Sequence, residues 1–205
     1  MALTLYFAPD SSSSPITWAL AELGLEYEAV ELDLRNPDAW KSNLLPLNPM
    51  AQVPTLIDDG QPLFESSAIL VHLGDRYGVE RGLWPAIDSP DRMVALSWTM
   101  WFAVTVGSAM KMVMLNTGTW WPAQMQNELQ AAKGRERLTS LLTILDERLA
   151  TQPYIVGSTF SLVDALGAPT LRWASHGIGF DLAATPHVSA WVERCIARDT
   201  VEQMK

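Results

Sequence analysis

Residues 48–56 read Asn48-Pro49-Met50-Ala51-Gln52-Val53-Pro54-Thr55-Leu56, and the first third of the chain is organised around them. Pro54 stands at the entrance of an apolar strand and cannot donate a hydrogen bond to a neighbouring strand. If the Val53–Pro54 bond is cis, the turn leaves the amide and the carbonyl of Val53 along an unpaired edge. A peptide-like ligand can pair with such an edge as an added strand. Because cis bonds make up only about 5% of X-Pro bonds, an ordinary edge proline is the alternative.

Strands and helices alternate on both sides of this stretch. Apolar runs bounded by turn residues predict four strands, at residues 3–7, 27–32, 53–57 and 61–64. Helical spacing with terminal signals predicts three helices, at residues 14–23, 37–45 and 66–77. The order strand, helix, strand, helix, strand, strand, helix is typical of a small mixed sheet with helices packed on it. Residues 1–78 are therefore expected to form an α/β domain.

The rest of the chain has only helical patterns. Residues 79–89 contain Gly, Pro and Ser and are interpreted as a linker; helices are predicted at 90–115, 124–150, 161–175 and 186–198. The sequence therefore predicts a second, all-helical domain over residues 90–205. Within it, residues 93–110 carry no charge and reach the length of a transmembrane helix. Interspersed Ser, Thr and Gly favour a buried core or subunit-interface helix instead.

The composition excludes several classes of protein and of partner. The chain has 205 residues, 48% of them hydrophobic, which is enough for a substantial core. Its 14 Lys and Arg against 23 Asp and Glu give a net charge of −9, which disfavours nucleic acid and anionic membranes as partners. Cys195 is the single cysteine, so no intramolecular disulfide can form. No secretory signal is visible, and a cytoplasmic location is expected.

A predicted strand runs into a predicted helix at Phe64-Glu65-Ser66-Ser67-Ala68-Ile69. The free amides and the positive dipole end of that helix can bind a carboxylate, while Glu65 can accept an ammonium group. This short segment could thus hold the head group of an amino acid. The alternative is that Ser66 is simply a helix cap.

A second junction, Tyr6-Phe7-Ala8-Pro9-Asp10-Ser11-Ser12-Ser13-Ser14-Pro15, places four serines between a strand and a helix. Ser14 suits the N-cap, with Pro15 at the first helical position. A hydroxyl in this loop can donate a hydrogen bond to a bound thiolate, whose pKa the helix N-terminus also lowers. A serine hydrolase is a poor alternative, because the chain has no Gly-x-Ser-x-Gly motif.

In their order and separation, these three segments resemble the cytosolic glutathione S-transferases, in particular serine-type bacterial members. A further motif, Phe160-Ser161-Leu162-Val163-Asp164-Ala165, is similar to the family's capping box, in which Ser161 and Asp164 satisfy the first amides of a buried helix. The resemblance extends over essentially the whole chain. It implies a thioredoxin-like N-terminal domain that binds glutathione and an all-helical C-terminal domain that supplies the electrophile pocket.

The resemblance also implies roles for individual residues in binding glutathione. Val53, with a cis Pro54, would pair with the cysteinyl backbone of the tripeptide. Glu65 and Ser66 would hold its γ-glutamyl end. Gln52 would approach the glycyl end or the neighbouring backbone.

The residue that activates the thiol has two candidates. The register of the serine-type classes points to Ser11, which is the preferred assignment, and the register of the cysteine-type bacterial class points to Ser12. With Ser12 in place of that cysteine, no mixed disulfide with glutathione can form there, which argues against thiol-transferase activity.

Aromatic residues early in the predicted helix 90–115 provide candidates for the electrophile pocket. Trp98, Trp101 and Phe102 are apolar and bulky, as the lining of a pocket for apolar ligands requires. The alternative for each of them is core packing or a homodimer interface.

The expected function is conjugation of the glutathione thiolate to an apolar electrophile, with glutathione as co-substrate and no metal ion. Two alternatives stay open: a glutathione-dependent isomerase or dehalogenase, and a non-catalytic protein of the same fold that binds ligands or a partner. The resemblance further implies a homodimer that acts in detoxification.

Overall fold

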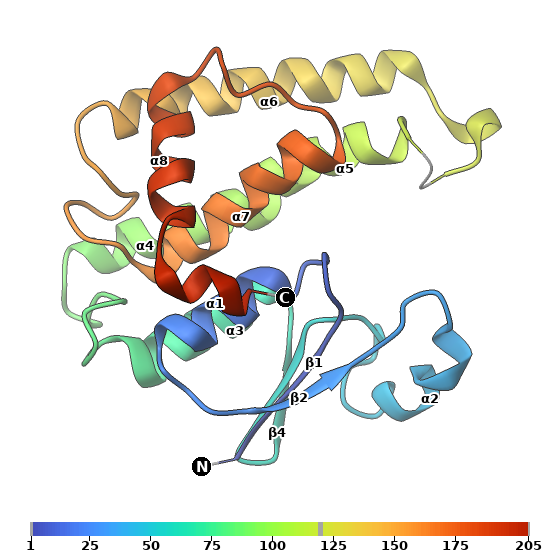
Figure 1. Ribbon diagram of the computed structural model, residues 1–205, viewed down its shortest axis with the longest axis vertical. Helices are drawn as coiled ribbons and strands as arrows, with labels where there is room; N and C mark the ends of the chain where they lie inside the picture. Colours follow the sequence, from blue (N-terminus) through green and yellow to red (C-terminus); the bar gives the residue numbers. More distant parts are fainter. Residues whose placement is uncertain (1, 119–120, 205) are drawn as a thin grey trace. The chain divides into compact units, whose positions relative to one another are not determined.

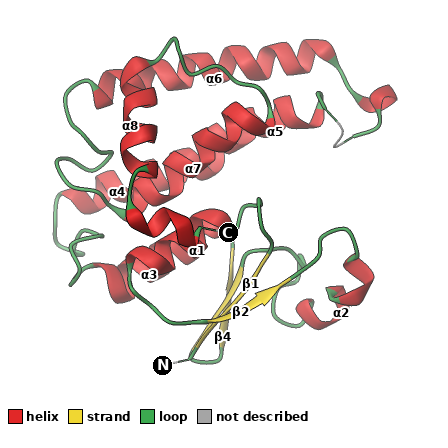
Figure 2. Ribbon diagram, viewed as in Figure 1, coloured by secondary structure: helices red, strands yellow, loops and turns green. Residues whose placement is uncertain are grey.

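The computed structural model describes residues 2–118 and 121–204, and the chain forms two compact units. The first unit comprises residues 1–89 together with 198–205, and the second comprises residues 90–197. Figure 2 shows the four-stranded sheet in the first unit and helices in the second. The predicted fold class, a thioredoxin-like domain followed by a helical domain, is confirmed.

The sheet of the first unit is mixed and has the strand order β2-β1-β3-β4. β1 (Leu3–Phe7) runs parallel to β2 (Glu28–Glu31) and antiparallel to β3 (Thr55–Asp58). β4 (Gln61–Phe64) closes a hairpin with β3. Alternate side chains of β1 are buried, as the two-residue period of a strand requires. The predicted strands are present, with β3 beginning directly after Pro54.

Two helices, α1 (Ser14–Glu22) and α3 (Ser66–Leu73), lie side by side on the sheet (Figure 1). α3 continues into a π-helical turn, η2 (Gly74–Gly78), and α2 (Lys41–Leu44) follows a short 3₁₀ turn, η1 (Pro37–Ala39). Fully buried apolar side chains from the strands and the two long helices form the core: Leu5, Leu56, Trp18, Leu20, Ile69 and Leu70.

The predicted linker, residues 79–89, belongs to the first unit. Trp84 packs its indole over Gly74, where a Cβ atom would stand only 2.5 Å from the ring. Trp84 Nε1 also donates a hydrogen bond to Asp75 Oδ1 at 2.8 Å. The segment is therefore fixed to the end of α3 by a tryptophan that fits only against glycine.

The end of the chain, which was expected in the helical domain, belongs to the first unit, where η5 (Asp199–Gln203) packs on α1. Arg198 and Glu22 form an ion pair with an N–O distance of 2.6 Å. Trp18 Nε1 donates a hydrogen bond to Thr200 Oγ1 at 3.0 Å. These partners are far apart in the sequence, so no local pattern indicated the contact.

Four long helical stretches make up most of the described part of the second unit. They are residues 91–115, which run through α4 (Asp91–Met100), the π-helical η3 (Trp101–Val106) and α5 (Gly107–Leu115), then α6 (Glu128–Leu149), α7 (Leu162–Gly177) and α8 (Pro186–Ile196). A short 3₁₀ turn, η4 (Ala123–Met125), precedes α6. Figure 1 shows α6 alongside α5. All four predicted helices are therefore present.

One helix in the described ranges, Asp91–Leu115, is long and apolar enough to cross a membrane by length and composition alone. About 33% of its most apolar stretch is buried inside the protein. The core helix of a soluble protein meets the same criterion, so this helix is weak evidence for a membrane span.

The capping box predicted at Ser161 and Asp164 is present at the start of α7. One oxygen of the buried Asp164 carboxylate accepts hydrogen bonds from the Ser161 N–H and Oγ, at 2.9 and 2.8 Å. The other accepts from the Ile155 N–H and from Trp191 Nε1, both at 2.9 Å. Burial raises the pKa of Asp164, whereas these donors act in the opposite direction. This carboxylate joins α7 to α8 and to the loop before α7.

Replacing Asp164 with Ala should lower the free energy of unfolding by about 3 kcal/mol or more, because three buried N–H groups lose their acceptor. Denaturant unfolding measures this loss. Asp181→Ala is the matched control, since among the described residues this exposed carboxylate accepts a hydrogen bond from the Ala183 N–H alone, and its loss should cost less than about 1 kcal/mol. Equal losses for the two variants would contradict the bridging role of Asp164.

Candidate functional site

Three segments of the first unit meet at a pocket of about 110 Å³: the loop before α1, the turn before β3 and the start of α3. The lining residues are Ser12, Asn48, Met50, Gln52, Val53, Pro54, Phe64, Glu65 and Ser66. They include every residue that the sequence resemblance implied for glutathione binding and one of the two candidate thiol-activating serines. The structure thus brings together six predicted site residues from three segments that are separate in the sequence.

The backbone of Val53 lines this pocket. The Val53–Pro54 peptide bond is cis, as the resemblance implied. The Val53 carbonyl accepts a hydrogen bond from Ser12 Oγ at 3.0 Å. In the described ranges 2–118 and 121–204, no group accepts a hydrogen bond from the Val53 N–H. An extended peptide could therefore pair with this one residue through both of its backbone groups.

The turn that carries Val53 is held by Asn48, which the sequence analysis did not single out. Asn48 is only 2% exposed, and its Nδ2 donates to the Gln52 carbonyl at 2.9 Å and to Thr55 Oγ1 at 3.0 Å. Its Oδ1 accepts from the Met50 N–H at 2.9 Å. The buried Asn48 amide thus hydrogen-bonds residues both before and after Val53, and these bonds fix the shape of the turn.

Three residues beside or within the pocket loops have left-handed backbone conformations: Asp10 (φ 53°), Ala51 (φ 46°) and Glu65 (φ 69°). A non-glycine residue in this region is strained by on the order of 1–3 kcal/mol and persists only when its surroundings hold it. Such residues cluster at binding sites. None of the three is glycine, so no residue type in the sequence indicated these conformations.

The start of α3 combines free amides with an exposed carboxylate. Glu65 occupies the N-cap position, and its carboxylate makes no capping hydrogen bond. The first helical hydrogen bond runs from the Ile69 N–H to the Glu65 carbonyl at 3.0 Å, so the preceding amides have no partner within the helix. Ser66 is the first helical residue, which excludes the alternative that it is the helix cap.

The two candidate serines have different surroundings. Ser11 Oγ donates to the Ala8 carbonyl at 2.6 Å and accepts from the Ser13 N–H at 3.1 Å, so it is engaged within its own loop. Ser12 is exposed and lines the pocket. Ser13 takes the N-cap position that the sequence analysis gave to Ser14, the first residue of α1.

The aromatic residues predicted for an electrophile pocket lie in the second unit and differ in exposure. Phe102 is 1% exposed and stacks on Trp191, with 6.2 Å between ring centroids. Trp98 and Trp101 are half-buried, with ring centroids 4.8 Å apart, and the Arg148 guanidinium lies over Trp98 at 5.1 Å. Phe102 therefore packs the core, while the two tryptophans keep accessible surface.

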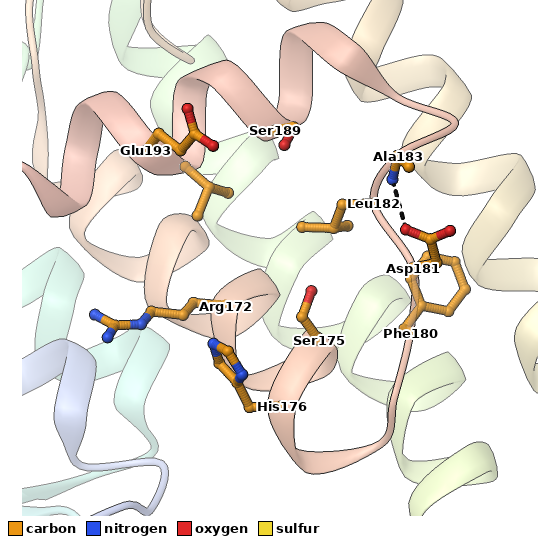
Figure 3. Close-up of a pocket in the computed structure, with 10 residues that line it drawn as sticks. Arg172, Ser175, His176, Phe180, Asp181, Leu182, Ala183, Ser189 and Glu193 are labelled. Carbon is orange, nitrogen blue, oxygen red and sulfur yellow. Dashed lines mark hydrogen bonds between the residues drawn. The ribbon is translucent and has the colours of Figure 1, made fainter.

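A second pocket, of about 430 Å³, lies between α7, α8 and the loop that joins them. Figure 3 shows Ser175 of α7 and Ser189 of α8 on opposite sides of it. Its ionisable side chains, Arg172, His176, Asp181 and Glu193, are exposed, and these described residues form no ion pair with one another within 4.0 Å. We place the candidate site at the smaller pocket, where the sequence motifs, the free Val53 amide and the strained residues coincide.

Within the described part of the chain, no three His, Cys, Asp or Glu side chains are grouped to bind a metal ion. Cys195, the single cysteine, is fully buried in α8. The polar groups gathered at the candidate site are therefore backbone amides, hydroxyls, amide side chains and one carboxylate.

Comparisons with known proteins agree with this architecture. The family model of the glutathione S-transferase N-terminal domain matches residues 1–75, and that of the C-terminal domain matches residues 104–199. Glutathione S-transferase 3 of Zea mays is 30% identical, over 98% of this chain and 92% of its own. The disulfide-bond oxidoreductase YfcG of Escherichia coli (strain K12) is 28% identical, over 98% of this chain and 93% of its own.

A solved structure of a sphingomonad glutathione S-transferase complexed with glutathione is similar in fold. It is 29% identical, has a TM-score of 0.84, and the match covers 97% of this chain and 95% of that one. The two family models match in chain order and together span more than half of the sequence. The chain belongs to the glutathione S-transferase family.

Proposed function

We propose that this protein is a glutathione transferase that joins the thiolate of glutathione to an electrophilic carbon of an apolar substrate. The observation that carries the proposal is the arrangement at Val53, where a free N–H and a carbonyl held by the Ser12 hydroxyl share one pocket with the start of α3. A thiol peptide needs a backbone edge, a donor to sulfur and a site for its charged head group, and this pocket offers all three.

The γ-glutamyl head group carries a carboxylate and an ammonium group. The amides at the start of α3 that have no partner within the helix, together with the Ser66 hydroxyl, suit the carboxylate. The exposed Glu65 carboxylate suits the ammonium group. Gln52, also exposed, is the proposed contact for the glycyl end.

Ser12 is the proposed donor to sulfur, in preference to Ser11. Its hydroxyl now bonds the Val53 carbonyl, which is the acceptor that the cysteinyl N–H of glutathione would use. When the tripeptide takes this carbonyl, the hydroxyl can rotate toward the sulfur. A hydrogen bond to the thiolate favours the charged form and so lowers the pKa of the thiol. Ser11 is second choice because its hydroxyl is engaged with Ala8.

The reaction needs only the thiolate and a bound electrophile. A sulfur–carbon bond forms, and the leaving group departs with its electron pair or, in an addition, the adjacent carbon takes a proton. The half-buried Trp98 and Trp101 are the proposed apolar contacts for the electrophile. Homodimerisation, a cytoplasmic location and a role in detoxification are part of this proposal on the strength of family membership.

A second candidate is glutathione-dependent thiol–disulfide exchange, which the name of the relative YfcG favours. In that reaction two glutathione molecules reduce one disulfide to two thiols and leave as glutathione disulfide. The buried Cys195 offers no accessible protein thiol, so both electrons must come from glutathione. Product analysis with an aryl halide and with a small disulfide separates the two activities.

Ser12→Ala should raise the pKa of enzyme-bound glutathione by about 1 unit or more, because the thiolate loses its donor. The thiolate's ultraviolet absorbance, followed as a function of pH in the binary complex, measures this pKa. The rate constant kcat at pH 6.5 should fall by about tenfold or more, since less of the bound thiol is ionised.

Ser11→Ala is the matched control, since it removes a neighbouring hydroxyl that faces its own loop. It should shift the bound thiol pKa by less than about half a unit. A larger shift in Ser11→Ala than in Ser12→Ala would return the role to Ser11. No shift in either variant would exclude a serine as the activating group.

Glu65→Gln should weaken glutathione binding by about tenfold, because the ammonium group loses a charge-assisted hydrogen bond. Titration calorimetry measures the affinity. A glutathione analogue without the α-amino group should bind the variant and the unaltered protein equally well. If the variant bound both ligands with reduced affinity, Glu65 would act on the pocket as a whole and not on the ammonium group.

A further inference from the structure

A buried carboxylate ties α3 to β3 at the end of these elements away from the pocket. Asp58, the last residue of β3, is 4% exposed. It accepts hydrogen bonds from the Tyr77 hydroxyl at 2.9 and 3.0 Å, and it lies 2.7 Å from His72 Nε2. Arg76 Nη1 lies 3.2 Å from Asp58 Oδ2, and the same guanidinium also forms an ion pair with the exposed Asp59. Three side chains of α3 and η2 thus converge on one carboxylate.

The same two elements carry the candidate site at their opposite ends. β3 begins at Thr55, directly after Pro54, and ends at Asp58. α3 begins at Ser66 in the pocket, is 8 residues and about 12 Å long, and has His72 in its last turn. Fixing the far end of α3 to β3 therefore fixes the direction in which its first turn points.

Glu65 is the residue that depends on how α3 is held, because it joins β4 to α3 in a left-handed backbone conformation. Phe64, the residue before it, is paired with Thr55 of β3. A strained residue with φ of 69° stays in place only when both flanking elements are held. The strand pairing holds one flank, and the contacts of Asp58 hold the other.

The hydrogen bond from the Tyr77 hydroxyl to Asp58 persists over the physiological pH range. Burial, followed by the hydrogen bond to Asp58, raises the pKa of Tyr77 to about 12. The tyrosine therefore keeps its proton and remains a donor throughout the physiological range. A buried carboxylate with several donors is costly to disrupt, since removing its acceptor oxygens leaves the donors unpaired.

We propose that Asp58 is a positioning residue of the glutathione site: through His72 and Tyr77 it holds α3 on β3, so that Glu65 and the first amides of α3 meet the γ-glutamyl head group. This inference rests on the proposed function. Asp58 touches no reacting atom, and its effect passes through Glu65. The thiol itself is placed by Val53 and Ser12, so the contacts of Asp58 bear on glutathione affinity and not on the chemical step.

The first test is Asp58→Asn, in which the amide keeps the shape but turns an NH₂ group toward the donors. Steady-state kinetics and calorimetry are run at a temperature where circular dichroism shows each variant folded. The KM and Kd for glutathione should rise about fivefold or more. The kcat at saturating glutathione and the KM for the electrophile should stay within about twofold. Asp59→Asn, the same change one residue along at the exposed partner of Arg76, should leave glutathione affinity within about twofold.

The second test is a double-mutant cycle between Asp58→Asn and Glu65→Gln. If Asp58 acts through Glu65, the double variant should lose less affinity than the product of the two single losses, by about threefold or more. Tyr77→Phe removes one donor while keeping the ring, and it replaces Asp58→Asn in both measurements if the latter does not fold.

Two results would overturn the inference alone: a lowered melting temperature of Asp58→Asn with unchanged glutathione affinity, or single losses that simply multiply in the double variant. Either would make Asp58 a stability residue without effect on the site. Failure of the unaltered protein to bind glutathione would instead overturn the proposed function, and this inference with it.

Discussion

The first unit depends on one constraint: the backbone of Val53 must stay available while hydrogen bonds hold the turn before it and the strand after it. The buried Asn48 amide closes the turn before it, and β3 pairs on both sides immediately after it. A backbone N–H without a protein partner is tolerated only where solvent or a ligand can take it. The hydrogen-bonded surroundings thus keep the backbone groups of Val53 accessible for pairing with another extended peptide.

Two buried carboxylates stabilise the two units in a similar way. Asp164 accepts hydrogen bonds from the cap of α7, the preceding loop and α8, and Asp58 gathers side chains of α3 and η2 onto β3. A buried charge is costly unless it is paired, so each carboxylate locks the elements that supply its donors. In the helical unit this locks the core. In the first unit the contacts of Asp58 also bear on the candidate site, because α3 begins in the pocket.

The sequence predicted the order of strands and helices, the capping box and the pocket residues, because each depends on local spacing and on short motifs. It did not indicate that η5 packs on α1, since Arg198 and Glu22 meet only after the chain has folded. It did not predict the roles of Asn48 and Asp58, which depend on their burial, or the left-handed backbone conformation of Glu65. The choice between Ser11 and Ser12 could not be made from register, because adjacent residues of one loop point in different directions.

Amide hydrogen exchange at Val53, followed by nuclear magnetic resonance, tests the central claim most directly. Glutathione or its S-methyl derivative, which cannot react, is added to the labelled protein, and exchange at each backbone amide is compared with that of the free protein. The Val53 amide should exchange readily in the free protein and become protected when the tripeptide binds, while the amides within β3 are protected in both states. Binding of glutathione without any change at Val53 would contradict the pairing on which the proposed site is built.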